Sequence, residues 1–240
     1  MRGVVEFAVR RLFLLLAAWD ASSGVHPAYA QQTELKTEFI SQQTPSWCWA
    51  ATAGMALEFL KFPDINPVRN YQCGVVAAAF PGCDDDCTRC DTTLDTMMSF
   101  VGVLKRYRAL ALHGKPVGLQ RAFSPNYVAY PTYAHVRRSL NLSYPVIAGI
   151  SADQRPLNPA EPQHAVLITG YDDDYQASGE PWVVVRDPYP YAAGDNPWVS
   201  AGYPYRQDSG RAMVPWRVLR DQLNLTSAVF LERLTAEGGG

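Results

Sequence analysis

The chain has 240 residues, of which 48% are hydrophobic, and its 21 Lys and Arg residues against 23 Asp and Glu residues give a formal net charge of −2. This length is enough for one domain with a buried core. The nearly balanced charge excludes the basic footprint that is typical of nucleic-acid-binding proteins, so we expect no nucleic acid among the partners.

The first thirty residues have the composition and order of a secretory signal. A basic start, a short apolar run and small residues at a cleavage point follow one another: Arg2, Arg10 and Arg11, then residues 12–19, then Ala28 and Ala30. The alternative is a membrane anchor, but a membrane span needs roughly 20 apolar residues, and this run ends at Asp20. We therefore expect residues 1–30 to be a signal peptide and residues 31–240 to form one domain. The mature protein is then secreted or periplasmic, without membrane contact after cleavage.

Helical patterns dominate the first half of this domain. We expect four helices, over residues 47–62, 72–80, 92–107 and 133–142. The first follows Pro45 and Ser46, which suit a turn and a helix start, and it ends before Pro63. The third places apolar residues on one side: Leu94, Met97, Met98, Val101 and Leu104.

Strand patterns follow from residue 145. Short segments rich in β-branched residues lie between Gly, Pro and Asp punctuation, at residues 145–150, 164–172, 181–187 and 227–234. Helices first and strands later predict the α+β class, with segregated layers. The segments 151–163 and 188–210 are long loops rich in proline, and loops of this length are usually functional or mobile.

All five cysteines lie after residue 31, and an exported chain meets an oxidising compartment in which cysteines tend to pair. An odd number leaves one thiol free, and Cys48 stands apart from the other four. We expect those four to form two disulfides: Cys73, Cys83, Cys87 and Cys90. Three connectivities are possible, and we disfavour Cys73 with Cys83, because a helix between them carries the chain about 10 Å away. The alternative is a Cys₄ zinc site, although only Cys87 and Cys90 have the usual spacing.

Cys48 lies between two tryptophans at the expected start of the first helix. Alone, a cysteine in an apolar helix is ordinarily buried and inert. A helix N-terminus and a neighbouring imidazolium both favour the thiolate that a nucleophile needs. The domain offers His113, His135 and His164. The first two lie in a turn and in a weak helix and are expected at the surface, whereas His164 opens a strand directly after a polar loop.

Asp187 follows the next expected strand and is the candidate to orient the imidazole. If residues 164–172 and 181–187 pair as an antiparallel hairpin, the start of one strand lies opposite the end of the other, and His164 and Asp187 become neighbours. The alternative for Asp187 is a turn residue before Pro188. The run Asp172 to Asp174 lacks the pattern of a calcium loop and is expected to be a solvated turn, so we expect no metal.

These segments, taken in order, resemble the papain-like cysteine peptidases. "Q-x-x-x-x-x-CWAA", "HAVLITGYD" and "VVVRDPYP" are similar to the bacterial branch of secreted enzymes and effectors with a CWA nucleophile motif. The resemblance implies a helical subdomain with the nucleophile helix, an antiparallel β subdomain and a cleft between them. It also implies that Cys48 attacks the peptide carbonyl and that His164 transfers the proton. By the same resemblance, Asp187 orients His164, and Gln42 donates a hydrogen bond to the oxyanion. Gln43 is the alternative register for that glutamine.

The function expected from this resemblance is hydrolysis of peptide bonds in a protein or peptide substrate, with no cofactor. The chain departs from the eukaryotic papain signature, because it lacks the Cys-Gly-Ser-Cys lead-in and has an aspartate where papain has an asparagine. Two alternatives remain. The same residues serve an acyltransferase or side-chain amidase of the transglutaminase type, or the fold is a catalytically silent binding protein that uses its Tyr-rich loops as a surface.

Overall fold

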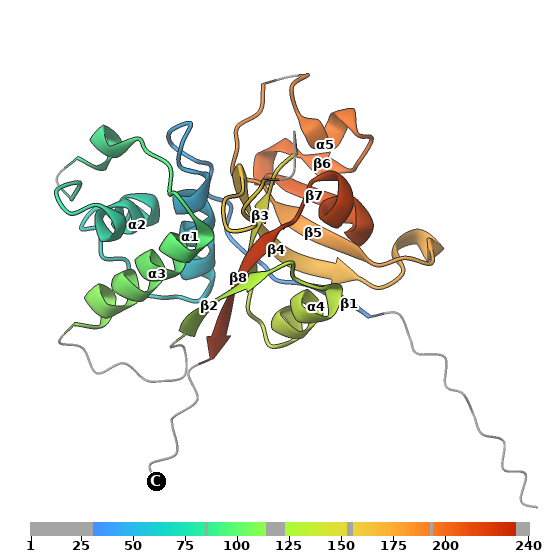
Figure 1. Cartoon of the computed structure of the whole chain (residues 1–240), viewed down its shortest axis with the longest axis horizontal. Coiled ribbons are helices and arrows are strands. Elements are labelled where there is room, and N and C mark those ends of the chain that lie inside the picture. The colour runs from blue at the N-terminus through green and yellow to red at the C-terminus, as the bar shows by residue number, and fades with distance from the viewer. Residues whose placement is uncertain (1–30, 85, 114–122, 153–155, 193, 234–240) are drawn as a thin grey trace, which may run out of the picture.

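A computed structural model describes residues 31–240 except 85, 114–122, 153–155, 193 and 234–240. It consists of a helical half and a β half that lie side by side (Figure 1). The helical half contains α1 (Cys48–Phe59), α2 (Tyr71–Ala79), a short 3₁₀ turn (Cys87–Cys90) and α3 (Met97–Leu112). The expectation of an α+β fold with a papain-like arrangement of two halves is confirmed.

The β half is a single antiparallel sheet with the strand order β2-β8-β3-β4-β5-β7-β6. Its strands are β2 (Phe123–Ala129), β3 (Val146–Ile150), β4 (His164–Asp172), β5 (Trp182–Arg186), β6 (Tyr205–Arg206), β7 (Arg211–Pro215) and β8 (Ser227–Arg233). The N-terminal strand β1 (Gln32–Glu34) pairs with the far end of β4. Two short helices, α4 (Tyr133–Asn141) and α5 (Pro197–Ser200), accompany the sheet.

The antiparallel hairpin expected from the sequence is present. β4 and β5 pair antiparallel, from Leu167 opposite Arg186 to Asp172 opposite Trp182. The start of β4 therefore lies close to the end of β5. This register brings the first residue of β4, His164, toward Asp187, which directly follows β5.

Helix α1 is the element that joins the two halves. It is rich in Ala and apolar residues and is buried on nearly all sides, from Trp49 to Leu57. It packs against α2 on one side and against β4 on the other, and the Thr52 hydroxyl donates to the Ala165 carbonyl at 3.1 Å. Such a helix belongs in an interior, because an apolar surface all round gains by burial on every face. The first residue of α1 is thus held rigidly against β4.

Several elements differ from the sequence-based expectations. The third helix begins at Met97 rather than at residue 92, because the Thr96 side chain accepts the Ser99 backbone N–H and caps the helix there. Leu94 therefore precedes the helix, and Met98 is 62% exposed rather than on the apolar side. The buried face keeps Met97 and Leu104 from the expected set and adds four residues: Phe100, Val103, Tyr107 and Ala111.

Four strands were not expected from the sequence: β1, β2, β6 and β7. β2 contains Pro125, which lowers its strand propensity, and it lies at an edge of the sheet, where a proline is tolerated. The others span two to five residues. β1 and β6 have too few residues to show a strand pattern, and β7 (RAMVP) contains a single β-branched residue, Val214.

The cysteines are arranged as two disulfides and one free thiol. Cys73 pairs with Cys87 and Cys83 with Cys90, with Cα–Cα separations of 5.2 and 6.1 Å. The disfavoured link between Cys73 and Cys83 is not formed. Cys48 is free and partly exposed.

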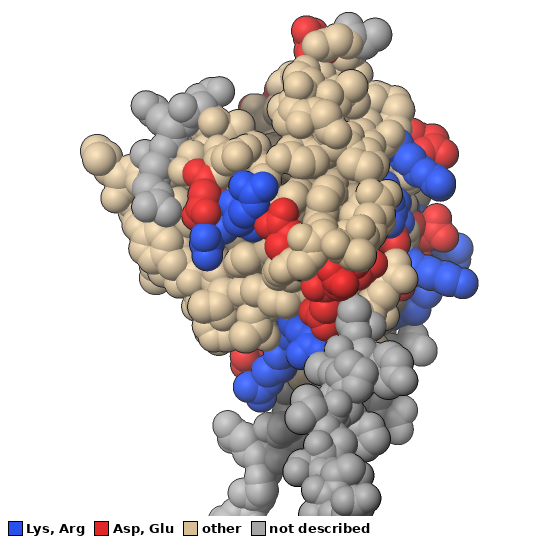
Figure 2. All heavy atoms as spheres, turned by 90° about the vertical axis from the view of Figure 1, so that its right-hand side faces the viewer, with Lys and Arg blue, Asp and Glu red and all other residues tan. Residues whose placement is uncertain are grey.

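The surface carries charges of both signs. On the face shown in Figure 2, acidic and basic side chains lie next to one another over a largely uncharged background. The ion pairs include Arg137–Asp173, at 3.1 Å, and Arg217–Glu180, at 2.8 Å. Among the described residues, no helix has the length and apolar character needed to cross a membrane.

Candidate active site

Cys48 is the first residue of α1, and the two tryptophans beside it fix its backbone. The indole N–H of Trp47 donates to the Cys90 carbonyl and that of Trp49 to the Thr92 carbonyl, each at 3.1 Å. Both side chains are buried. The tryptophans therefore attach both flanks of Cys48 to the segment that follows the Cys83–Cys90 disulfide. Cys48 is partly exposed and lies at the N-terminal end of a helix, where the helix dipole favours an anion.

His164 faces Cys48 from the start of β4. Its Nε2 lies 2.8 Å from Asp187 Oδ1, and its side chain hydrogen-bonds to the Cys48 thiol. Because Nε2 contacts the carboxylate, Nδ1 is the ring nitrogen available to exchange a proton with the thiol. The side chain of His164 is 20% exposed, and that of Asp187 is fully buried. Thiol, imidazole and carboxylate thus form one continuous chain of contacts across the junction of the two halves.

The charges of this chain support one another. Burial on its own lowers the pKa of His164, but the charge and hydrogen bond of Asp187, with a contribution from Cys48, raise it to about 10. Burial raises the pKa of the Cys48 thiol, yet the hydrogen bond and charge of His164 lower it overall. Burial likewise opposes ionisation of Asp187, and His164 nevertheless holds the pKa of this carboxyl below its ordinary value. The arrangement therefore favours a thiolate–imidazolium pair at neutral pH.

Gln42 lies beside the helix start and is 6% exposed. Its side-chain amide donates to the carbonyls of Thr44 and Pro45, each at 2.9 Å, and its backbone N–H donates to the Pro188 carbonyl at 2.9 Å. Its Oε1 is buried without a partner among the described residues. Gln42 thus braces the turn before Cys48. To donate to a substrate oxygen, it has to exchange one of these two carbonyls for the new acceptor.

Gln43, the alternative register, has a different environment. It is exposed, and its Oε1 accepts a hydrogen bond at 3.1 Å from Asn70, the N-cap residue of α2. The other two histidines are also remote from this chain of contacts. His113 ends α3, and His135 takes part in the capping box of α4 with Thr132.

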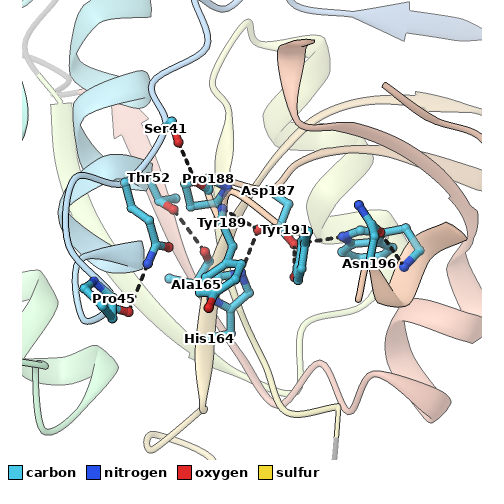
Figure 3. A network of polar contacts seen from close by, with 12 residues as sticks. Ser41, Pro45, Thr52, His164, Ala165, Asp187, Pro188, Tyr189, Tyr191 and Asn196 are labelled. Atoms are coloured by element: carbon cyan, nitrogen blue, oxygen red, sulfur yellow. Dashed lines mark hydrogen bonds and ion pairs between the residues drawn. The ribbon is translucent and has the colours of Figure 1, made fainter. Parts of the chain in front are cut away.

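Three residues of the long loop after β5 contact the carboxylate of Asp187 and were missed in the sequence. The Tyr189 backbone N–H donates to Oδ1 at 2.9 Å, and the Tyr191 hydroxyl and Trp198 indole N–H donate to Oδ2 at 2.8 Å each. Figure 3 shows this network between His164 and Asn196. The motif Asn196-Pro197, a typical N-cap followed by proline, indicates the start of the short helix that carries Trp198. Nothing in the sequence points from Tyr191 to Asp187.

A small pocket opens beside the thiol and the imidazole. Its walls come from α1, from the segment before α3 and from the start of β4, and they are mainly apolar, with Trp49, Leu94, Met97, Phe100 and Pro162 among them. A side chain bound there would lie next to Cys48. Within the described part of the chain, no cluster of three or more His, Cys, Asp or Glu residues is arranged to hold a metal ion.

A model of the Peptidase_C39 like family matches residues 28–210 of the chain. The matched range contains Gln42, Cys48, His164 and Asp187. No curated protein sequence matches the chain at a significant level.

Proposed function

The chain belongs to the Peptidase_C39 like family, and from this premise we propose that it is an exported papain-like cysteine peptidase that hydrolyses peptide bonds through Cys48, His164 and Asp187. The observation that carries the proposal is the unbroken chain of contacts from the free thiol through the imidazole to the buried carboxylate. Its substrates are proteins or peptides, and its chemistry uses no cofactor.

In the first half of the reaction, the Cys48 thiolate attacks the carbonyl carbon of the scissile bond. The negative charge moves to the carbonyl oxygen, which the Cys48 backbone N–H and the Gln42 side-chain amide stabilise. The tetrahedral intermediate collapses, the C–N bond breaks, and His164 gives its proton to the leaving amine. A thioester between Cys48 and the acyl part of the substrate remains.

In the second half, a water molecule replaces the amine. Neutral His164 takes a proton from this water as the oxygen attacks the thioester carbonyl, and the C–S bond then breaks. The products are a carboxylic acid and the regenerated Cys48–His164 ion pair. Asp187 does not react, but it holds the ring so that one nitrogen faces the thiol throughout.

The proposal is tested by trapping the thioester. A mixture of unmodified peptides is incubated with the protein, the reaction is quenched in acid, and the mass of the peptide that contains Cys48 is measured. We expect an acyl adduct on Cys48 and free peptide fragments, and neither product from Cys48→Ala. A protein that forms the adduct but passes it mainly to an added amine is an acyltransferase, and a protein that forms no adduct with any peptide is a binding protein.

We also propose that residues 1–30 direct export and are removed. The two disulfides fit an extracellular or periplasmic protein. The backbone nitrogen of Gln31 lies 3.2 Å from Asp173 Oδ2, and the Gln31 carbonyl accepts the Asp173 N–H at 3.0 Å. A chain cut after Ala30 would present its new ammonium group to this carboxylate. N-terminal sequencing of the exported protein should therefore begin at Gln31, and retention of residues 1–30 would contradict the proposal.

A further inference from the structure

The carboxylate of Asp187 accepts four hydrogen bonds, two at each oxygen, although its side chain is fully buried. Oδ1 accepts from His164 Nε2 and from the Tyr189 backbone N–H. Oδ2 accepts from the Tyr191 hydroxyl and from Trp198 Nε1, at 2.8 Å each. His164 is the one partner that carries a charge. The donors on Oδ2 are neutral, and both come from the loop of residues 188–210 (Figure 3).

The loop holds the two Oδ2 donors firmly. Asn196 caps α5 by accepting the backbone N–H groups of Trp198 and Val199 at 2.9 and 3.2 Å, and Trp198 is 2% exposed. The Tyr191 ring packs against Tyr189 at a centroid separation of 4.8 Å, and the Tyr191 carbonyl accepts Gln207 Nε2 at 3.1 Å. These contacts fix both donors relative to β5 before any substrate is bound.

The far end of the loop is tied back to Asp187. The Asp187 backbone N–H donates to the Gly210 carbonyl at 2.8 Å. Gly210 has a φ of +53°, and a Cβ at this position would lie 2.3 Å from the Asp187 carbonyl oxygen. Only glycine fits such a close approach in this backbone conformation. The loop therefore begins and ends at the residue that orients the imidazole.

A buried carboxylate without donors takes up a proton instead of staying charged. In that state Asp187 would no longer support the imidazolium of His164, and the Cys48 thiolate would lose its partner. A hydrogen bond to a charged group stabilises that group more than a bond to a neutral group does. Each Oδ2 donor therefore favours the ionised carboxylate, and two donors on one oxygen also prevent rotation of the carboxylate plane.

We propose that Tyr191 and Trp198 are positioning residues that keep Asp187 ionised and oriented, and that they thereby extend the reactive Cys48–His164 pair into acidic solution. This inference rests on the proposed function. It assigns a task to the loop of residues 188–210, whose sequence shows only that it is long and aromatic. Neither residue contacts the thiol, so both act through Asp187 and His164.

Measurements in acidic solution report mainly on the ionisation of Asp187 and the Cys48–His164 pair, because few other groups around Asp187 titrate there. His164 from β4, with Cys48 beyond it, and Tyr191 and Tyr205 from the loop and β6 face the carboxylate. Burial raises the pKa of both tyrosines further above their ordinary value, so they stay neutral below pH 8. Loss of one donor raises the pKa of Asp187. The pH below which the thiolate disappears then rises with it.

The experiment measures the rate of Cys48 alkylation by iodoacetamide between about pH 3 and 8, in the full mature protein and in Tyr191→Phe, Trp198→Phe and the double variant. We expect the acid limb of the rate profile to move upward by about one pH unit for each donor removed. Rates at pH 8 should stay within about threefold of the unchanged protein, because Asp187 is ionised there in every variant.

One matched control comes from the same loop and the other from β5. Tyr203→Phe and Trp182→Phe make the same chemical changes, at rings that pack against each other 6.3 Å apart, and the Trp182 indole donates to Ser178 rather than to Asp187. Both controls should keep the acid limb unchanged. If Trp198→Phe unfolds, Tyr191→Phe decides the question. Unshifted limbs in folded variants would overturn this inference alone, whereas absence of acid labelling in the unchanged protein would overturn the proposed function with it.

Discussion

The helical half and the β half prepare their reactive groups by different means. The helical half fixes the backbone of Cys48 through two indole–carbonyl hydrogen bonds, at Trp47 and Trp49. The β half supplies charge, because its sheet and loop hold Asp187 ionised beside His164. A thiol on a well-packed helix stays protonated and unreactive without a partner, and a protonated imidazole is not itself a nucleophile. Reactivity arises where α1 docks on β4.

The largest effects should follow from removing either member of the pair at this junction. Cys48→Ala and His164→Ala should each abolish peptide hydrolysis, and the double variant should be no slower than either single variant. Groups that act as a unit do not give additive losses. Steady-state rates with a fluorogenic peptide measure this, and substantial turnover without His164 would refute the assignment.

Loss of the oxyanion donor should come next. Gln42→Ala should lower kcat by roughly 10²–10³ with little change in KM, because such a donor acts mainly in the transition state. The variant should also lose some stability, since Gln42 braces the carbonyls of Thr44 and Pro45. Gln43→Ala is the matched control, because its side chain bonds outward to Asn70. A large loss in Gln43→Ala alone would move the assignment by one residue.

Asp187→Ala should lower the rate by about 10²-fold, because this residue orients rather than reacts. The substitution also leaves the buried donors of Tyr191 and Trp198 without an acceptor. An unsatisfied buried donor costs about 1–3 kcal/mol, so we expect a lower free energy of unfolding as well. Urea denaturation measures the second effect. An unchanged midpoint would show that the donors find other partners.

Reducing agents should have a smaller effect, in two steps that distinguish the free thiol of Cys48 from the two disulfides. A mild reductant should raise activity by freeing Cys48 from oxidation. A strong reductant should then lower the melting temperature, since closing a loop of about 15 residues is worth roughly 3 kcal/mol. The disulfide Cys83–Cys90 also fixes the carbonyl that accepts the Trp47 indole, so the second step should lower activity too. Four free thiols in the non-reduced protein would contradict this expectation.

Long, strongly patterned segments could be predicted from the sequence. The residues around α1, β4 and β5 have clear helix or strand patterns, and the hairpin argument brings His164 to Asp187 because antiparallel register depends only on order and length. α2 and α4 were likewise expected close to their observed bounds, residues 72–80 and 133–142 against Tyr71–Ala79 and Tyr133–Asn141.

Other features depend on contacts that no local pattern contains. β2 holds a proline at an edge of the sheet, and β7 has only one β-branched residue, so neither has a clear strand pattern. Cysteine spacing allows three pairings, and only the packing of α2 on the 3₁₀ turn selects Cys73–Cys87. Tyr191 and Trp198 reach Asp187 because an irregular loop folds back on itself. The side-chain amide of Gln42 donates to the carbonyls of Thr44 and Pro45 in the turn before α1. The motif spacing does not reveal these contacts.

The most direct test is the reactivity of Cys48 in the native protein at about pH 6. Ordinary thiols near pKa 8.5 react slowly there, whereas a thiolate paired with an imidazolium reacts fast. Brief iodoacetamide treatment followed by peptide mass mapping should show carbamidomethylation at Cys48, and this modification should be lost in His164→Ala. Two results would contradict the claim that the two halves together create the nucleophile. One is an unmodified Cys48 in folded protein whose Cys48 is a reduced thiol, and the other is equal labelling with and without His164.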